Sequence, residues 1–141
     1  MADRVVGVDD LLREAREQLD RVSPEQARAA VAAGALIVDI RSERQRETHG
    51  VVPGAHVVPR NVLEWRADRA SPHRDEVLAA ADGPLVIMCQ EGYQSSLAAA
   101  TLLRLGREAT DIEGGFEAWR DAGLPVAPAD AAVGGGPEPA A

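Results

Sequence analysis

The residue with the clearest chemical potential in this 141-residue chain is its single cysteine, Cys89. It directly follows the apolar run 85–88, and the polar segment Gln90-Glu91-Gly92-Tyr93-Gln94-Ser95 separates it from a helical pattern. A helix N-terminus and inward-pointing backbone N–H groups favour a thiolate, which is the nucleophilic form of cysteine. Gly92 lets the segment curl because glycine readily adopts positive φ angles. Ser95 is placed to cap the helix and to offer a hydroxyl group. The spacing therefore predicts a nucleophilic cysteine at the base of a tight loop.

A structural role for the same residues is the competing interpretation. A lone cysteine is more often a small buried apolar residue than a nucleophile. Gly92 and Ser95 are also what an ordinary tight turn and helix start would contain. The order of strand, cysteine, glycine-containing loop and helix favours the reactive interpretation.

The elements around Cys89 alternate between short apolar strands and helices. Ser23-Pro24 has the composition of a helix start, and Gly34 that of a helix end. Alternating strands and helices predict an α/β domain with a mostly parallel sheet. We expect an N-terminal extension with a helix at 1–20, a folded domain at 21–127 and a disordered Ala/Gly/Pro tail at 128–141. The expected helices are 9–19, 24–33, 42–48, 61–66, 75–81, 95–105 and 116–122, and the expected strands are 35–40, 56–58, 85–88 and 108–112.

Two arginines join Cys89 at the carboxyl ends of predicted strands, where open parallel sheets bind their ligands. Arg60 follows the strand at 56–58, and we expect it to help hold an anion near Cys89. A surface ion pair is an equally good interpretation of Arg60. For Arg41, which follows the strand at 35–40, the favoured interpretation is a structural pair with Glu43 or Glu47.

Composition and charge exclude several classes of function. All 15 basic residues are Arg against 23 acidic residues, so the net charge is −8, which disfavours nucleic-acid binding and adsorption to anionic membranes. One cysteine allows no intrachain disulfide, and His49, His56 and His73 lack a metal-ligand spacing, so we expect no metal site. The sequence shows no signal peptide and no apolar run that spans a bilayer. We therefore expect a cytoplasmic protein.

Four separated segments give the sequence a recognisable pattern, and in this order they resemble the rhodanese (sulfurtransferase) domain family. The family's strand followed by Asp-x-Arg is similar to residues 37–43, and its Gly-His-Ile-Pro-Gly-Ala segment is similar to residues 50–59. Its active-site strand and Cys-x-x-Gly-x-x-Ser loop match residues 85–95. Its closing segment is similar to Glu113-Gly114-Gly115-Phe116-Glu117-Ala118-Trp119 and Gly123-Leu124-Pro125-Val126.

The resemblance implies a single rhodanese-like domain with a three-layer fold, in which helices cover both faces of a five-stranded, mostly parallel sheet. It also implies that Cys89 takes a sulfane sulfur from a donor, such as thiosulfate or a persulfide, and becomes a persulfide itself. A thiol, cyanide or a carrier protein then accepts the sulfur, without a cofactor. The residues expected to surround the substrate are Gln90, Glu91, Gly92, Tyr93, Gln94, Ser95 and Arg60.

Two other functions share this pattern in part. The dual-specificity phosphatases and arsenate reductases of the same fold require His before the cysteine and Arg six residues after it, and this chain has Met88 and Ser95 there. A non-enzymatic sulfur carrier, sensor or interaction module is the second alternative. The chain also departs from related sulfurtransferases, because Gln94 stands where Arg is frequent and Glu91 adds a negative charge. Both departures predict that thiosulfate is a poor donor.

Overall fold

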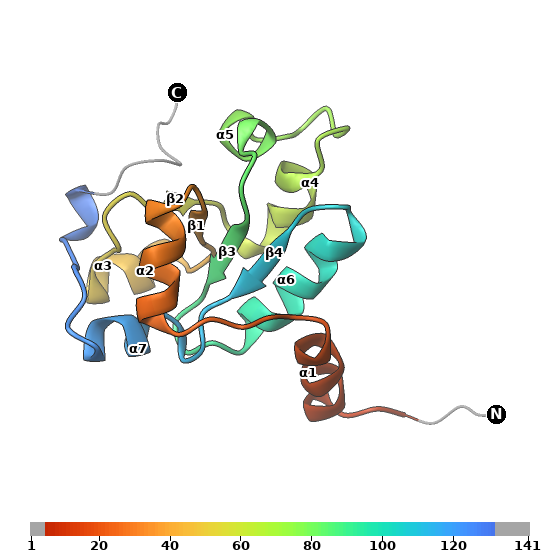
Figure 1. The fold of residues 1–141 in the computed structure, drawn as a ribbon, viewed down its shortest axis with the longest axis horizontal. Coiled ribbons are helices and arrows are strands. Elements are labelled where there is room, and N and C mark those ends of the chain that lie inside the picture. Colours follow the sequence, from red (N-terminus) through yellow and green to blue (C-terminus); the bar gives the residue numbers. More distant parts are fainter. Residues whose placement is uncertain (1–4, 132–141) are drawn as a thin grey trace.

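Four short parallel strands form the centre of the computed structural model, which describes residues 5–131 (Figure 1). The strands are β1 (Leu36–Asp39), β2 (His56–Val57), β3 (Leu85–Met88) and β4 (Ala109–Asp111), in the spatial order β2-β1-β3-β4. Leu36 of β1 pairs with Leu85 of β3, which in turn pairs with Ala109 of β4. Because all neighbours are parallel, their carboxyl ends meet at one edge of the sheet.

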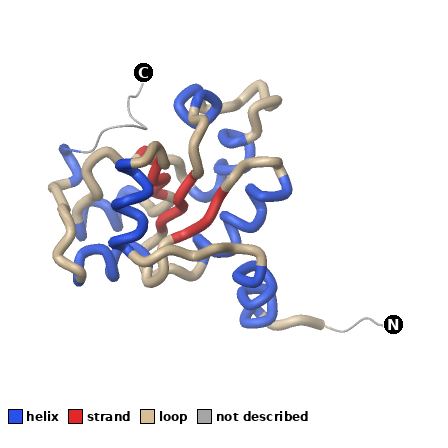
Figure 2. Tube along the Cα trace, viewed as in Figure 1, coloured by secondary structure: helices blue, strands red, loops and turns tan. Residues whose placement is uncertain are grey.

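Helices cover both faces of the sheet, as the three-layer prediction requires (Figure 2). The side chains of β3 alternate, so that Leu85 and Ile87 belong to one core and Val86 and Met88 to the other. The first core is covered by α4 (Leu63–Ala67), α5 (Glu76–Ala80) and α6 (Gln94–Arg104). The second is covered by α2 (Pro24–Ala32) and α7 (Gly115–Asp121). Cys89 lies in the first core, on the side of α6.

Local sequence signals explain where several helices begin and end. Ser23 caps α2 and Ser42 caps α3 (Glu43–His49), and in each case a glutamine three residues later completes a capping box. Past the end of α2, Gly34 has φ +114°, a conformation that favours glycine. The short 3₁₀ helix η1 (Arg60–Val62) precedes α4, so the helix expected at 61–66 is divided in two.

The predicted five-stranded sheet has four strands in the part of the chain that the structure describes. Val22 forms an isolated parallel bridge with Ile112, just beyond the end of β4. A single bridge does not extend into a strand, because Pro24 starts α2 two residues later. The difference is minor and leaves the strand ends around Cys89 unchanged.

Helix α1 (Val8–Glu17) and the last described residues pack against the domain, whereas residues 5–7 extend away from it (Figure 1). Helix α1 packs against α6. Near the other end, Ala127 pairs with Val51, and η2 (Ala129–Ala131) lies beside α3. A short helical turn therefore occupies the beginning of the segment expected to be disordered, and residues 132–141 of that segment lie outside the described residues. Within residues 5–131, no helix has the length and apolarity that crossing a membrane requires.

Candidate active site

Cys89 lies at the base of the loop between β3 and α6, and only 2% of its surface is exposed. Its Sγ accepts hydrogen bonds from the backbone N–H of Gly92, at 3.1 Å, and from that of Ser95, at 3.4 Å. No side chain caps the N-terminus of α6, and the Ser95 N–H belongs to the first turn of that helix. The sulfur therefore takes the acceptor position that a capping oxygen has elsewhere, and donors around it favour negative charge.

The loop holds its curled shape through close packing against the start of α7. Gly92 has φ +90°, and a Cβ built at this position would lie 2.8 Å from the backbone nitrogen of Gly114. The carbonyls of Cys89 and Gln90 accept the N–H groups of Phe116, at 2.9 Å, and Glu117, at 3.0 Å. Because these carbonyls bond outward to α7, the loop is free to direct other N–H groups toward the sulfur.

An open hollow in front of the sulfur is lined by residues of the loop and by one residue of α3. It contains Cys89 itself and mostly uncharged polar side chains. The loop residues that line it were expected from the sequence, but Gly92 and Ser95, also expected, are not among them, and Gln45 of α3 was not predicted. Glu91, Tyr93 and Gln94 are exposed, and Gln90 is half-buried because its side chain bonds to Arg41 and Glu117. The residues that line this hollow are Gln45, Cys89, Gln90, Glu91, Tyr93 and Gln94.

Ser95 differs from its predicted role. It is the second residue of α6 rather than its cap, which is Tyr93. Its hydroxyl donates to Asp111 Oδ2 at 2.8 Å instead of facing the hollow. The reason is that a buried hydroxyl satisfies the buried carboxylate of Asp111, while the Ser95 backbone N–H serves the sulfur.

The two strand-end arginines have separate environments. Arg41 is structural as predicted, but its partner is Asp39, at 2.9 Å, and not Glu43 or Glu47. Both side chains of this pair are fully buried, and the Arg41 guanidinium also stacks on Phe116, with its central carbon 4.0 Å from the ring centre.

Arg60 forms an ion pair with Glu64 at 3.0 Å and is partly exposed. It lines a second hollow, together with Asn61 and Arg41, that does not include Cys89. Gln45 and Gln94 line both hollows, so the two hollows adjoin, with Cys89 in one and Arg60 in the other. The structure consequently places the one arginine expected to hold a substrate anion beside the site and paired with a carboxylate.

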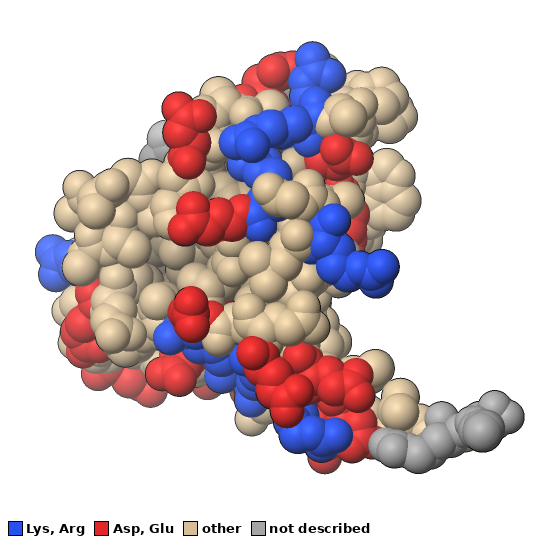
Figure 3. Space-filling model, turned by 45° about the vertical axis from the view of Figure 1, so that its right-hand side comes forward, with Lys and Arg blue, Asp and Glu red and all other residues tan. Residues whose placement is uncertain are grey.

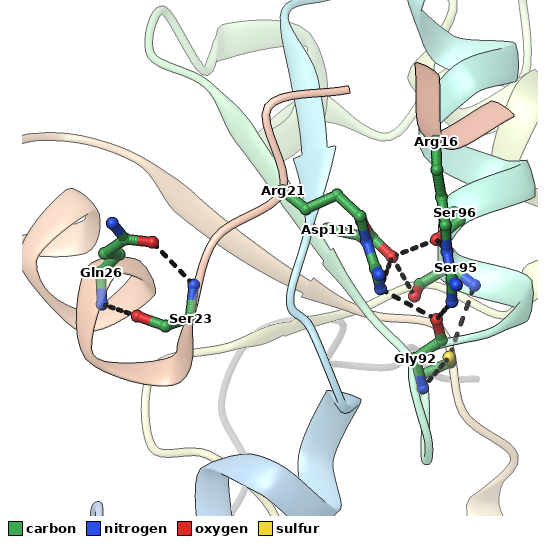
Figure 4. Close-up of polar contacts among 9 residues, drawn as sticks. Arg16, Arg21, Ser23, Gln26, Gly92, Ser95, Ser96 and Asp111 are labelled. Carbon is green, nitrogen blue, oxygen red and sulfur yellow. Dashed lines mark hydrogen bonds and ion pairs between the residues drawn. The ribbon is translucent and has the colours of Figure 1, made fainter. Parts of the chain in front are cut away.

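A group of charged side chains behind the loop was not predicted from the sequence (Figure 4). Arg16 and Arg21 both donate to the carbonyl of Gly92, at 2.8 Å and 3.1 Å. Arg21 also pairs with Asp111, whose side chain is fully buried. Asp111 is the last residue of β4, so the expectation that ligands bind at the carboxyl ends of parallel strands could have identified it as well. For Arg16, in a helix far from the loop in sequence, no comparable signal exists.

The surface around these elements carries mixed charge. Figure 3 shows one face on which basic side chains gather in the upper half with acidic side chains beside them, while acidic side chains gather at the lower right, over α1. Within residues 5–131, no group of three or more His, Cys, Asp and Glu side chains is placed to hold a metal ion.

Comparison with known proteins agrees with this geometry. The family model of the rhodanese-like domain matches residues 23–122. The thiosulfate sulfurtransferase GlpE of Pseudomonas paraeruginosa is 32% identical over 119 residues, which cover 84% of this chain and 96% of that protein. The GlpE protein of Stutzerimonas stutzeri is 37% identical over 103 residues, or 71% of this chain and 84% of its own length. The chain belongs to the rhodanese-like domain family. With such relatives over most of its length, it is a rhodanese-type sulfurtransferase.

A solved structure from Rhodopseudomonas palustris has a TM-score of 0.80 and 34% identity, covering 89% of this chain and 98% of that one. It is described as a protein of unknown function and possible tyrosine phosphatase. In the present chain, Ser95 stands where a phosphatase needs the arginine that binds the phosphate dianion. Arg60 and Arg41 are each paired with a carboxylate, so neither replaces it.

Proposed function

We propose that Cys89 is the sulfur-carrying nucleophile and that the reaction proceeds in two displacements. The Cys89 thiolate attacks the sulfane sulfur of a donor. With thiosulfate, the new bond joins Sγ to that sulfur, the sulfur–sulfur bond of thiosulfate breaks, and sulfite leaves with the bonding electron pair. The enzyme now carries a persulfide anion. An acceptor such as cyanide then takes the terminal sulfur as thiocyanate, and the Cys89 thiolate is regenerated.

The observation that carries this proposal is the pair of backbone N–H groups on the Cys89 sulfur. A hydrogen bond to a charged acceptor contributes about 1.5–3 kcal/mol, roughly twice the value for a neutral one. Donors already aimed at the sulfur need no reorganisation when negative charge develops there. The Gly92 and Ser95 N–H groups therefore stabilise the Cys89 thiolate, both when it attacks the donor and when it leaves in the second displacement.

The lining of the hollow supports a donor with little negative charge of its own. Its side chains beside the sulfur include the amides of Gln45, Gln90 and Gln94 and the carboxylate of Glu91. Thiosulfate is a dianion and meets no unpaired cation there, because Arg60 is bound to Glu64 outside this hollow. We therefore propose that thiosulfate is used with a high KM and that a thiol persulfide or a protein-bound persulfide is the better donor.

Acceptors of the same chemistry are thiols, cyanide and a carrier protein. A reducing compartment such as the cytoplasm suits this cycle, because Cys89 must return to the free thiolate after every turnover.

A steady-state assay of thiocyanate formation tests this proposal. We expect turnover with cyanide as acceptor, and a higher kcat/KM with a small thiol persulfide than with thiosulfate. The Cys89→Ser variant controls for transfer that does not use the site, and it should show only the background rate. Turnover by Cys89→Ser at the wild-type rate would overturn the role of Cys89. A low KM for thiosulfate would overturn the preference for the donor.

A further inference from the structure

The carbonyl of Gly92 points away from the active-site hollow and is held by two arginine side chains from outside the family match at 23–122. Arg16, in α1, donates through Nη2 at 2.8 Å, and Arg21 donates through Nη2 at 3.1 Å. The neighbouring loop carbonyls of Cys89 and Gln90 receive backbone N–H groups of α7 instead. The backbone of α7 thus anchors the carbonyls of Cys89 and Gln90, and two guanidinium groups anchor the carbonyl of Gly92.

This anchor fixes the orientation of a peptide group at the reacting centre. No peptide bond in residues 5–131 is cis, so the N–H of Tyr93 points opposite to the Gly92 carbonyl of the same peptide plane. Gly92 itself donates its N–H to Sγ, and Ser95 does so three residues later. A rotation of the peptide between them would turn a carbonyl oxygen toward the sulfur, where it would repel a thiolate or a persulfide. Glycine at φ +90° allows such a rotation more readily than any other residue.

The two arginines are themselves held in place, but not equivalently (Figure 4). Arg21 pairs with Asp111, which also accepts the hydroxyls of Ser95 and Ser96. Arg16 donates from Nε to Ser96 Oγ at 3.0 Å and lies over the ring of Tyr93 at 5.7 Å. Arg21 and Asp111 offset each other in charge, and Arg16 adds a positive charge behind the loop.

From these contacts we propose that Arg16 is a positioning residue of the active site. Acting through the Gly92 carbonyl, it holds the loop in the conformation that directs N–H groups at the sulfur of Cys89. Its positive charge further polarises the peptide in the direction that favours an anionic sulfur. The proposal makes α1, which precedes the family match, a working part of the site. It deepens the proposed function and rests on it only for the turnover measurement.

The test compares three variants of the full-length chain. Arg16→Met removes the donors and the charge but retains most of the apolar stem, while Arg16→Lys retains the charge and one donor group. Arg13→Gln is the matched control, because Arg13 lies on the same helix, is largely exposed and pairs with Asp10. Arg21 is a poorer choice, because its removal leaves the buried Asp111 carboxylate without a cation.

Two readouts are measured for each variant: kcat and KM for sulfur transfer, and the rate constant for alkylation of Cys89 by iodoacetamide at pH 7. We expect Arg16→Met to lower kcat about tenfold with KM nearly unchanged, and to slow alkylation by a factor of several. Arg16→Lys should recover most of both losses, and Arg13→Gln should behave as the wild type.

Two results would overturn the proposal. The first is an Arg16→Met variant that alkylates and turns over as the wild type does. The second is faster alkylation in both Arg16 variants together with a lower Tm, because this would show that α1 only supports and covers the loop. Alkylation does not depend on a sulfur donor, so it decides on Arg16 even if the wild type transfers no sulfur. Failure of the proposed function is therefore distinguishable from failure of this inference.

Discussion

The loops that follow β1 and β3 have the same topology, but their polar groups are satisfied in different ways. Each leaves the carboxyl end of a central strand and enters a helix. After β1, Ser42 caps α3 through its side chain, and the buried charges of Asp39 and Arg41 satisfy each other. After β3, no side chain caps α6, and backbone N–H groups converge on the sulfur of Cys89.

The difference shows what separates a reactive strand end from a structural one. Near its start, each loop has a buried polar or reactive side chain at the edge of the sheet, Arg41 in one and Cys89 in the other, so burial and position alone do not distinguish them. In the β1 loop, the hydrogen-bond donors and acceptors satisfy one another. In the β3 loop, backbone N–H donors point at the sulfur of Cys89, which lines an open hollow. A site for an anionic intermediate forms where helix and loop donors lack an oxygen acceptor of their own.

Breaking the β1 loop should give the largest change in stability. Arg41→Met leaves the carboxylate of Asp39 buried without its cation, and we expect the free energy of unfolding to fall by about 3–5 kcal/mol. Urea unfolding at pH 7 measures this change. Arg44→Met, at an exposed position of α3, is the matched control and should change stability by less than about 0.5 kcal/mol. Equal effects of the two substitutions would show that the Asp39–Arg41 pair is not what stabilises this loop.

Adding a positive charge to the β3 loop should improve the use of thiosulfate as the sulfur donor. Gln94→Arg places a positive charge at the hollow, and we expect the KM for thiosulfate to fall about tenfold at low ionic strength. Glu91→Gln should give a smaller gain, because the side chain of Glu91 is exposed. Steady-state kinetics at two salt concentrations test the cause, because the gain must shrink as salt increases. If neither substitution lowers KM, charge at the hollow does not control the use of thiosulfate.

The N-terminus of α5, which a carboxylate caps, should make a smaller contribution to stability that depends on pH. Asp75 caps α5, and although partial burial opposes its ionisation, hydrogen bonds from Leu78, His56 and Val77 lower the pKa of this carboxyl below its usual value. A lowered folded-state pKa stabilises the protein above the ordinary pKa, and this stabilisation is lost as the pH falls through the folded value.

We therefore expect Asp75→Ala to reduce the free energy of unfolding by about 1 kcal/mol at pH 7. The difference from the wild type should begin to shrink below about pH 4, where the carboxylate becomes protonated in the unfolded chain, and should be lost as the pH falls through the lower folded-state pKa. Urea unfolding at pH 7 and pH 3.5 measures it, with Asp82→Ala at an exposed position as the control. A difference that stays constant between the two pH values would contradict the assigned role of the carboxylate.

Much of the fold was predictable because local signals agree with the tertiary structure. Continuous apolar runs identified β1 and β3, and the order Ser23-Pro24 identified the start of α2. The fifth strand, which only the family resemblance implied, is reduced in the described residues to the bridge between Val22 and Ile112. The four strands read from the residues themselves are the four that the sheet contains.

The site was predictable only where residues are close in sequence. The loop from Cys89 to Ser95 could be identified, because the strand end, the glycine and the helix start are adjacent in the chain. The partner of Arg41 was misassigned, because a surface ion pair with Glu43 or Glu47 was expected and Asp39, two residues before it, was given no weight. Arg16 reaches Gly92 across 76 residues, and such contacts depend on how α1 packs on α6.

The central claim is that the β3 loop holds a transferable sulfur on Cys89, and the intact mass of the protein tests it most directly. After incubation with thiosulfate or a small persulfide, the wild type should gain the mass of one sulfur atom and lose it again when cyanide is added. Cys89→Ser should gain nothing under the same conditions. A labile sulfur on Cys89→Ser, or an unmodified wild type after exposure to every donor, would contradict the account.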